Sequence, residues 1–176
     1  MTDLDEVTTD RLILRRMEAE DWAAQLRLDG DPRVMATLGG LRPPERTQAY
    51  AEEQARHWAE HGFGWWALLD RETEELVGRG GIRFIELEEA DRPVEVGYAL
   101  VPERWGEGLA TEVAREAVHV GREVLGLDRI VGLALPTNTA SRRVLEKVGL
   151  EYRRDIVYKG FPSVLYEWIR SEGSHA

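Results

Sequence analysis

The sequence contains no cysteine. This absence excludes a disulfide framework, a thiolate metal site and a cysteine nucleophile. Long apolar runs are absent too, because the longest, such as residues 65–69, fall far short of the roughly 20 residues that span a bilayer. The N-terminus is acidic and has no basic segment followed by an apolar one, so no signal peptide is indicated. Together these absences favour a cytoplasmic protein.

Basic residues are the minority among the charged ones. There are 23 Lys and Arg against 33 Asp and Glu, which gives a formal net charge of −10. Nucleic acids and anionic membrane surfaces are bound by basic patches, so neither is expected as a partner. The negative charge is compatible with a cationic substrate, including an amine.

The 176 residues suffice for one domain with a sizeable core, and no repeat or linker divides them. Alternation of apolar residues predicts strands over 8–17, 63–70, 75–87, 93–101, 129–135, 150–158 and 162–170. Helical spacing predicts helices over 18–28, 45–61, 109–125 and 139–148, with loop from 33 to 43. We therefore expect a single α/β (α+β) domain over residues 1–176. Its core would cover about 8–169, with a frayed polar tail after Arg170. A mixed, mostly antiparallel sheet of about six to seven strands would be flanked by about four helices.

A pair of glycines precedes the third predicted helix. Gly106 and Gly108 flank Glu107, directly before Leu109. The first N–H groups of a helix lack partners and lie at the positive end of its dipole, so they receive phosphate oxygens well. Glycine lets the backbone approach a diphosphate without an intervening Cβ. Taken alone, the stretch fits an ordinary turn equally well, and Thr111 stands where the nucleotide fingerprint G-x-G-x-x-G needs its third glycine.

A second group of residues opens the fourth predicted helix. Asn138, Ser141 and Leu145 are spaced i, i+3 and i+7, so they share one helical face. With the glycine loop and the stretches TDRLILR, VEVGYALVPERWGEGLATE and NTASRRVLEKVGL, this face resembles the GNAT superfamily of acetyl-CoA-dependent N-acetyltransferases. Residues 105–110 match the family's loop pattern with tryptophan in the first position. That substitution looks like the branch of ribosomal-protein N-terminal acetyltransferases, and the resemblance covers roughly residues 8–169.

The resemblance implies acetyl-CoA as the donor and places its binding residues. Backbone N–H groups of the loop would hold the pyrophosphate, from Trp105, Gly106, Glu107, Gly108, Leu109, Ala110 and Thr111. The strand end at Ala99, Leu100 and Val101 would pair with the pantetheine arm. The N–H of Leu100 would also stabilise the oxyanion. Asn138 would hydrogen-bond the pantetheine. Arg104, Arg142 and Arg143 would meet the outer phosphates, although Arg142 could equally pair with Glu146.

The resemblance also implies catalytic residues. Many GNAT enzymes carry a tyrosine seven residues after the asparagine, to protonate the leaving thiolate, but Leu145 stands there. Ser141 would substitute for it, the alternative being a serine bonded to its own backbone. Glu95 lies on the strand that feeds the loop and, by alternation, shares a face with Gly97 and Ala99. It would accept the amine's proton directly or through a water; a structural ion pair is the alternative.

The implied reaction is direct transfer of acetyl to a primary amine in a ternary complex, the acceptor being a protein N-terminal α-amine or a small molecule. A serine intermediate at Ser141 has no His or Lys activator in the motif. The alternative from another functional class is a non-catalytic CoA-binding sensor or scaffold. The resemblance is compatible with a homodimer, although no stretch specifies an interface.

Two other features invite a functional interpretation. His57 and His61 are spaced i, i+4 but lack a third ligand, so we expect a solvated helix face and no metal. Trp58, Trp65 and Trp66 are expected in the core or in the wall of the acceptor pocket. Tyr98, facing away from Glu95, is expected in the core.

Overall fold

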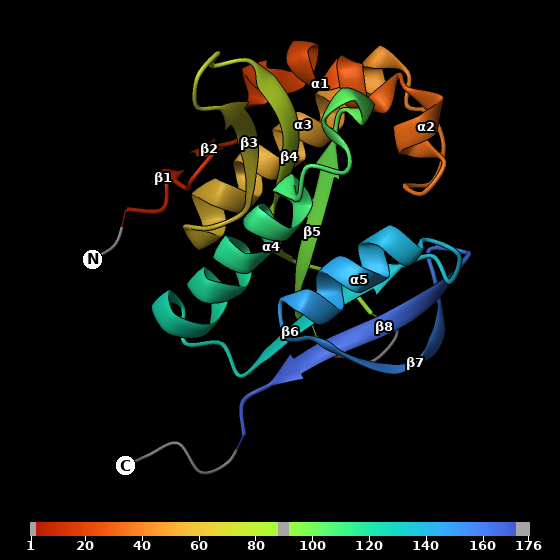
Figure 1. Ribbon diagram of the computed structural model, residues 1–176. Helices are drawn as coiled ribbons and strands as arrows, with labels where there is room; N and C mark the ends of the chain where they lie inside the picture. Colours follow the sequence, from red (N-terminus) through yellow and green to blue (C-terminus); the bar gives the residue numbers. More distant parts are fainter. Residues whose placement is uncertain (1–2, 88–91, 172–176) are drawn as a thin grey trace.

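An eight-stranded mixed sheet runs through the molecule in the order β1-β2-β3-β4-β5-β6-β8-β7 (Figure 1). The computed structural model describes residues 3–87 and 92–171. All neighbouring strands are antiparallel except β5 and β6, which run parallel. The predicted class, α/β (α+β) with a mostly antiparallel sheet, is confirmed. The strands are β1 (Glu6–Thr8), β2 (Leu12–Arg16), β3 (Trp65–Asp70), β4 (Leu76–Phe84), β5 (Val94–Leu100), β6 (Arg129–Ala134), β7 (Glu151–Tyr158) and β8 (Phe161–Ile169).

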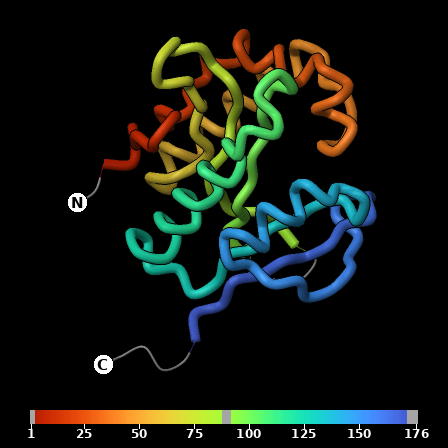
Figure 2. Tube along the Cα trace, viewed as in Figure 1, coloured from red at the N-terminus to blue at the C-terminus, as the bar shows by residue number. Residues whose placement is uncertain are grey.

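Helices cover the sheet on both sides. Helix α4 packs on β4 and β5, and α5 packs on β6 and β7. These two helices contact each other and lie side by side in front of the sheet (Figures 1 and 2). Helix α3 lies behind β3 and β4 in Figure 1 and packs against α1. The helices are α1 (Trp22–Asp29), α2 (Pro32–Met35), α3 (Pro44–His61), α4 (Leu109–His119) and α5 (Thr139–Lys147).

Two short elements, β1 and α2, were not predicted. The prediction had seven strands and four helices, whereas the described residues form eight strands and five α-helices. Helix α2 falls in the stretch predicted as loop; it starts at Pro32, and the Asp31 side chain caps it by accepting from the N–H of Arg33. Elements of three or four residues are too short to show a periodicity, which explains both omissions.

The helix predicted over 109–125 changes character before its end. It is α-helical to His119 and continues as a π-helical turn, Val120–Val124, in which the N–H of Leu125 donates to the carbonyl of Val120 at 2.9 Å. A π-turn is wider than an α-turn and displaces the residues that follow it. Val124 is 38% exposed, although α-helical spacing from Leu109 and Val113, which are buried, would place it on their apolar face.

Helix α5 packs very closely on β6. A Cβ at Gly132 would lie 2.4 Å from Cδ2 of Leu145, and Leu145 is fully enclosed. Leu145 is thus a core residue, consistent with its unsuitability as a proton donor. No helix in the described part of the chain has both the length and the apolar character needed to cross a bilayer. The tail predicted to fray lies mostly outside the described residues.

Candidate active site

Strands β5 and β6 part shortly after they begin to pair. Their register contains only Val94 with Ile130 and Glu95 with Val131. Strand β5 continues alongside β4 as far as Leu100. Because the N–H of Val101 donates to Val77 on the β4 side, antiparallel alternation turns the N–H of Leu100 toward the edge that β6 has left. An open strand edge can hydrogen-bond an extended ligand, and the predicted residues Ala99 to Val101 lie at this edge.

The glycine loop follows directly and leads into α4. Gly106 and Gly108 have φ angles of 78° and 81°, a left-handed conformation that suits glycine. Gly108 is the N-cap of α4, and no side chain caps this helix end. The N–H groups that begin α4, at Leu109, Ala110 and Thr111, are therefore left for another acceptor. This is the geometry expected of an anion cradle.

Two side chains of the loop fix its shape. The indole N–H of Trp105 donates to the carbonyl of Leu100 at 2.8 Å, which ties the loop to the end of β5. Arg104 bonds the Glu107 carboxylate at 2.8 Å and Asp70 at 2.7 Å. The bond from Arg104, together with backbone N–H donors, lowers the pKa of Asp70 to about 2. Arg104 thus contributes to the loop by holding Glu107 in an ion pair.

Arg11 contacts this loop from the turn between β1 and β2, and the sequence did not predict its role. Its Nη1 donates to the carbonyl of Glu107 at 2.6 Å, and its Nε bonds Glu112 of α4 at 2.8 Å. Another terminal nitrogen lies 3.6 Å from the position that a Cβ of Gly108 would take. Arg11 is close to a hundred residues away in sequence, and no local pattern could have connected it to the loop.

Asn138 and Ser141 meet at the start of α5, as predicted. Asn138 Oδ1 accepts from the N–H of Ser141 at 3.1 Å, so Asn138 caps the helix. The Ser141 hydroxyl lies 3.1 Å from the hydroxyl of Tyr98, which also donates to the Ser141 carbonyl at 3.0 Å. Ser141 therefore faces β5. Tyr98 is half-buried and packs against the core, as expected, while its hydroxyl reaches Ser141. Burial raises its pKa and keeps its proton in place.

The predicted arginines of α5 differ in their surroundings. Arg142 Nε donates to the Tyr166 hydroxyl at 3.1 Å, and Tyr166 in turn donates to Glu146 at 2.9 Å. The anticipated pairing of Arg142 with Glu146 is thus mediated by a tyrosine. Arg143 is exposed.

Glu95 faces Arg83 across the β4–β5 ladder. Arg83 Nε lies 3.6 Å from Glu95 Oε2, and both side chains are largely buried. Burial raises the pKa of Glu95, and Arg83 opposes that shift. A carboxylate with a raised pKa is a better base at neutral pH. Residues 95 and 100 are about 16 Å apart on an extended strand, so a proton from an amine near Leu100 would reach Glu95 through water.

His57 is a structural residue. Its Nδ1 lies 2.9 Å from the carbonyl of Phe63, and its Nε2 accepts from the N–H of Phe84 at 3.1 Å. The expectation of a solvated face is therefore wrong for His57, whose pKa is lowered by burial. Among the described residues, no three His, Asp or Glu side chains gather as metal ligands would. Trp58, Trp65 and Trp66 are all buried.

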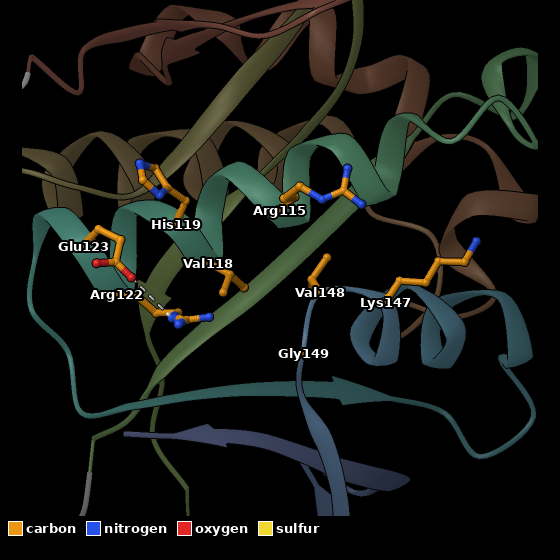
Figure 3. Close-up of a pocket in the computed structure, with 8 residues that line it drawn as sticks. All are labelled: Arg115, Val118, His119, Arg122, Glu123, Lys147, Val148 and Gly149. Carbon is orange, nitrogen blue, oxygen red and sulfur yellow. Dashed lines mark ion pairs between the residues drawn. The ribbon is translucent and has the colours of Figure 1, made fainter. Parts of the chain in front are cut away.

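A cleft of about 400 Å³ lies farther along α4, between this helix and the end of α5 (Figure 3). Figure 3 shows Arg115 on α4 and Lys147 on α5 extending from the two helices that face each other across it. Both cations are exposed and neither was singled out in the sequence. The lining residues are Arg115, Val118, His119, Arg122, Glu123, Lys147, Val148 and Gly149.

Comparison with known proteins identifies the family and the fold. A family model described as an acetyltransferase (GNAT) domain matches residues 11–151. The chain is 33% identical over 145 residues to the N-acetyltransferase YoaA of Bacillus subtilis, covering 81% of each chain. An acetyltransferase from Agrobacterium tumefaciens shares the fold with a TM-score of 0.82 at 24% identity, over 97% of both chains. RimL, a ribosomal-protein α-N-acetyltransferase solved with coenzyme A, superposes with a TM-score of 0.73 at 16% identity, over 93% of this chain and 96% of its own. The chain belongs to the GNAT family of acetyltransferases.

Proposed function

We propose that this acetyltransferase takes acetyl from acetyl-CoA and transfers it directly to a primary amine. One observation carries the proposal: the open edge of β5 leads straight into a glycine loop and an uncapped helix end. Acetyl-CoA has an extended pantetheine arm with a diphosphate at one end. The arm matches the strand edge, and the diphosphate matches the glycine loop and helix end that follow it. RimL, which shares the fold, was solved in complex with coenzyme A.

The residues present fit the cofactor. The N–H groups from Trp105 to Thr111 would hold the pyrophosphate, and the edge from Ala99 to Val101 would pair with the pantetheine. The amide nitrogen of Asn138 would hydrogen-bond the same arm, since its oxygen is taken by the helix cap. Arg142 and Arg143 remain candidates for the outer phosphates, while Arg104 would act by shaping the loop.

Arg115 and Lys147 join the candidates for the outer phosphates. Arg115 lies about 9 Å along α4 from Leu109, at 1.5 Å per residue. Helix α5 brings Lys147 to the facing side of the same cleft. Exposed cations on both walls give an acidic protein a local positive region where a polyanion needs one.

In the proposed reaction, the amine nitrogen attacks the thioester carbonyl carbon, and the bond from that carbon to sulfur breaks. The N–H of Leu100 would stabilise the oxyanion. Glu95 would take the amine's proton through water. Ser141 would turn its hydroxyl from Tyr98 to donate a hydrogen bond to the departing thiolate, and solvent would return the proton to sulfur.

Two measurements test the proposal. Acetyl-CoA should raise the melting temperature, because it binds only the folded state; no shift at millimolar cofactor would contradict the donor assignment. Release of free thiol from acetyl-CoA, screened over N-terminal peptides, amino acids, polyamines and aminoglycosides, then tests turnover. Binding without turnover for every acceptor would favour the sensor or scaffold alternative.

A further inference from the structure

Three arginines surround one tyrosine on the helix-α3 side of the sheet. The guanidinium carbons of Arg42, Arg79 and Arg83 lie 4.5, 4.9 and 5.9 Å from the ring centre of Tyr50. Arg83 also lies 4.9 Å from the ring centre of Trp65. A concentration of arginines beside the candidate base is unexpected for an acidic protein whose substrate is an amine.

Two of these arginines share one buried carboxylate. Asp29 is completely buried and bonds Arg79 at 2.7 Å and Arg42 at 3.2 Å. Thr47 donates a further hydrogen bond to the same carboxylate at 3.0 Å. Arg42 and Arg79 therefore form a closed network that fastens α1 and α3 to β4.

Arg83 differs from these two. Its Nε, like that of Arg79, is buried and donates no hydrogen bond. However, its carboxylate partner Glu95 lies 3.6 Å away, beyond hydrogen-bond distance, whereas Asp29 bonds Arg79 at 2.7 Å. The rest of the described chain offers this guanidinium no hydrogen bond either. A buried guanidinium N–H that donates no hydrogen bond is costly unless another group accepts from it. Carboxylates are the ligands that match its planar fork.

Trp65 places this guanidinium near the reacting end of β5. A Cβ at Gly97 would lie 2.5 Å from Cζ2 of Trp65, so the indole lies directly on Gly97. Arg83 packs over that indole. Its guanidinium therefore extends from the position opposite Glu95 toward Ala99, which is about 7 Å from Gly97 along the strand.

We infer that the acceptor is an amino acid, an amine that also carries a carboxylate, and that Arg83 binds this carboxylate while the amine faces the end of β5. The inference rests on the proposed function. Trp65 and Tyr50 would form apolar walls beside the bound group. The exposed carboxylates Glu53 and Glu86 lie nearby, where solvent screens their charge.

The test compares matched acceptors on the full-length protein with saturating acetyl-CoA. Each L-amino acid is assayed beside its carboxamide and the amine that lacks the carboxyl group, and kcat/KM is read from thiol release. ω-Amino acids of increasing length report the spacing between amine and carboxylate. The unmodified protein should prefer the carboxylate-bearing member by about tenfold to a hundredfold, the range for one charged hydrogen-bonded contact.

Variants of Arg83 then test whether this residue causes the preference for carboxylate-bearing acceptors. Arg83→Gln should remove most of it, while Arg83→Lys should retain part of it because charge remains without the fork. Because Arg83 also affects the pKa of Glu95, the readout is the ratio of kcat/KM between the carboxylate-bearing and the carboxyl-free amine, which a change in the base alters equally for both. Arg42→Gln, the matched control in the same cluster, should keep the preference. Unchanged acetyl-CoA affinity and melting behaviour would confirm that Arg83→Gln is folded.

Other outcomes overturn the inference. Turnover of polyamines or simple amines at rates equal to or above those of amino acids would refute it and leave the proposed transferase function intact. A preference that survives in Arg83→Gln, or that is lost equally in Arg42→Gln, would refute the role of Arg83. Absence of turnover with any amine would refute the proposed catalysis and this inference together.

Discussion

Gly106 offers the sharpest test of the anion cradle, because the chain contains a matched control for it. Gly106 has a φ of 78° and Gly126, beyond the π-turn, has a φ of 65°. At both positions a Cβ would meet nothing within 4 Å. Aspartate in either place adds the same charge and the same left-handed strain, about 1–2 kcal/mol. Gly106→Asp and Gly126→Asp should therefore lose similar stability.

Acetyl-CoA binding should separate the two variants. For an assumed separation of about 5.5 Å between the new carboxylate and a bound phosphate, like charges repel by about 3 kcal/mol at an effective dielectric constant of 20. Screening at an exposed loop reduces this value, so we expect Kd to rise about tenfold to a hundredfold. Gly126→Asp should bind nearly as the unmodified protein does.

Isothermal titration with acetyl-CoA measures both constants directly. Gly106→Ala isolates the backbone strain, and its smaller effect on Kd would identify charge as the main cause. Equal affinities for Gly106→Asp and Gly126→Asp would refute the reasoning, because the diphosphate would then lie elsewhere.

Three further predictions concern the base, the loop and the packing of α5. Glu95→Gln should lower kcat most at neutral pH and less at high pH, where the amine deprotonates unaided; an equal loss at every pH in the rate profile would contradict a base. Asp70, whose pKa falls from 3.8 to about 2 beside Arg104, stabilises the fold above pH 3.8 and loses that contribution as pH falls toward 2. Asp70→Asn should therefore melt lower at pH 7, with a gap that closes in acid, and a constant gap would exclude this origin. Gly132→Ala should cost about 1–3 kcal/mol in urea unfolding, because the methyl group would collide with Leu145; an unchanged midpoint would show that α5 can shift.

The sequence predicts the parts of the site that lie close together along the chain. Gly106 and Gly108 indicate a turn with left-handed residues, and Asn138 indicates a helix cap, because each signal depends on backbone conformation within a few residues. The fold class follows in the same way from strand and helix periodicities. The family resemblance assigns these local signals to one cofactor site. The open edge between β5 and β6 is a feature of the tertiary structure that no local signal indicates.

Contacts between distant segments could not be predicted in this way. Tyr98 and Ser141 are 43 residues apart, and only the packing of α5 beside β5 brings their hydroxyls together. Arg11 reaches Glu112 across 101 residues. The spacing of His57 along its helix predicted a solvated side chain. It could not predict the hydrogen bonds of the ring to the backbone groups of Phe63 and Phe84, which lie outside the helix. Such contacts depend on tertiary arrangement.

The separation of β5 from β6 has a mechanical consequence. The strands from β1 to β5 form one hydrogen-bonded lobe and those from β6 to β8 form another. Among the described residues, only the short parallel pairing at Val94 and Glu95 crosses between them within the sheet. A ligand hydrogen-bonded to the free edge of β5 and to the start of α5 would connect the two lobes. Binding the donor and stiffening the enzyme would then be a single event, and release of the spent cofactor would loosen the two lobes at the moment when the acetylated product has to leave.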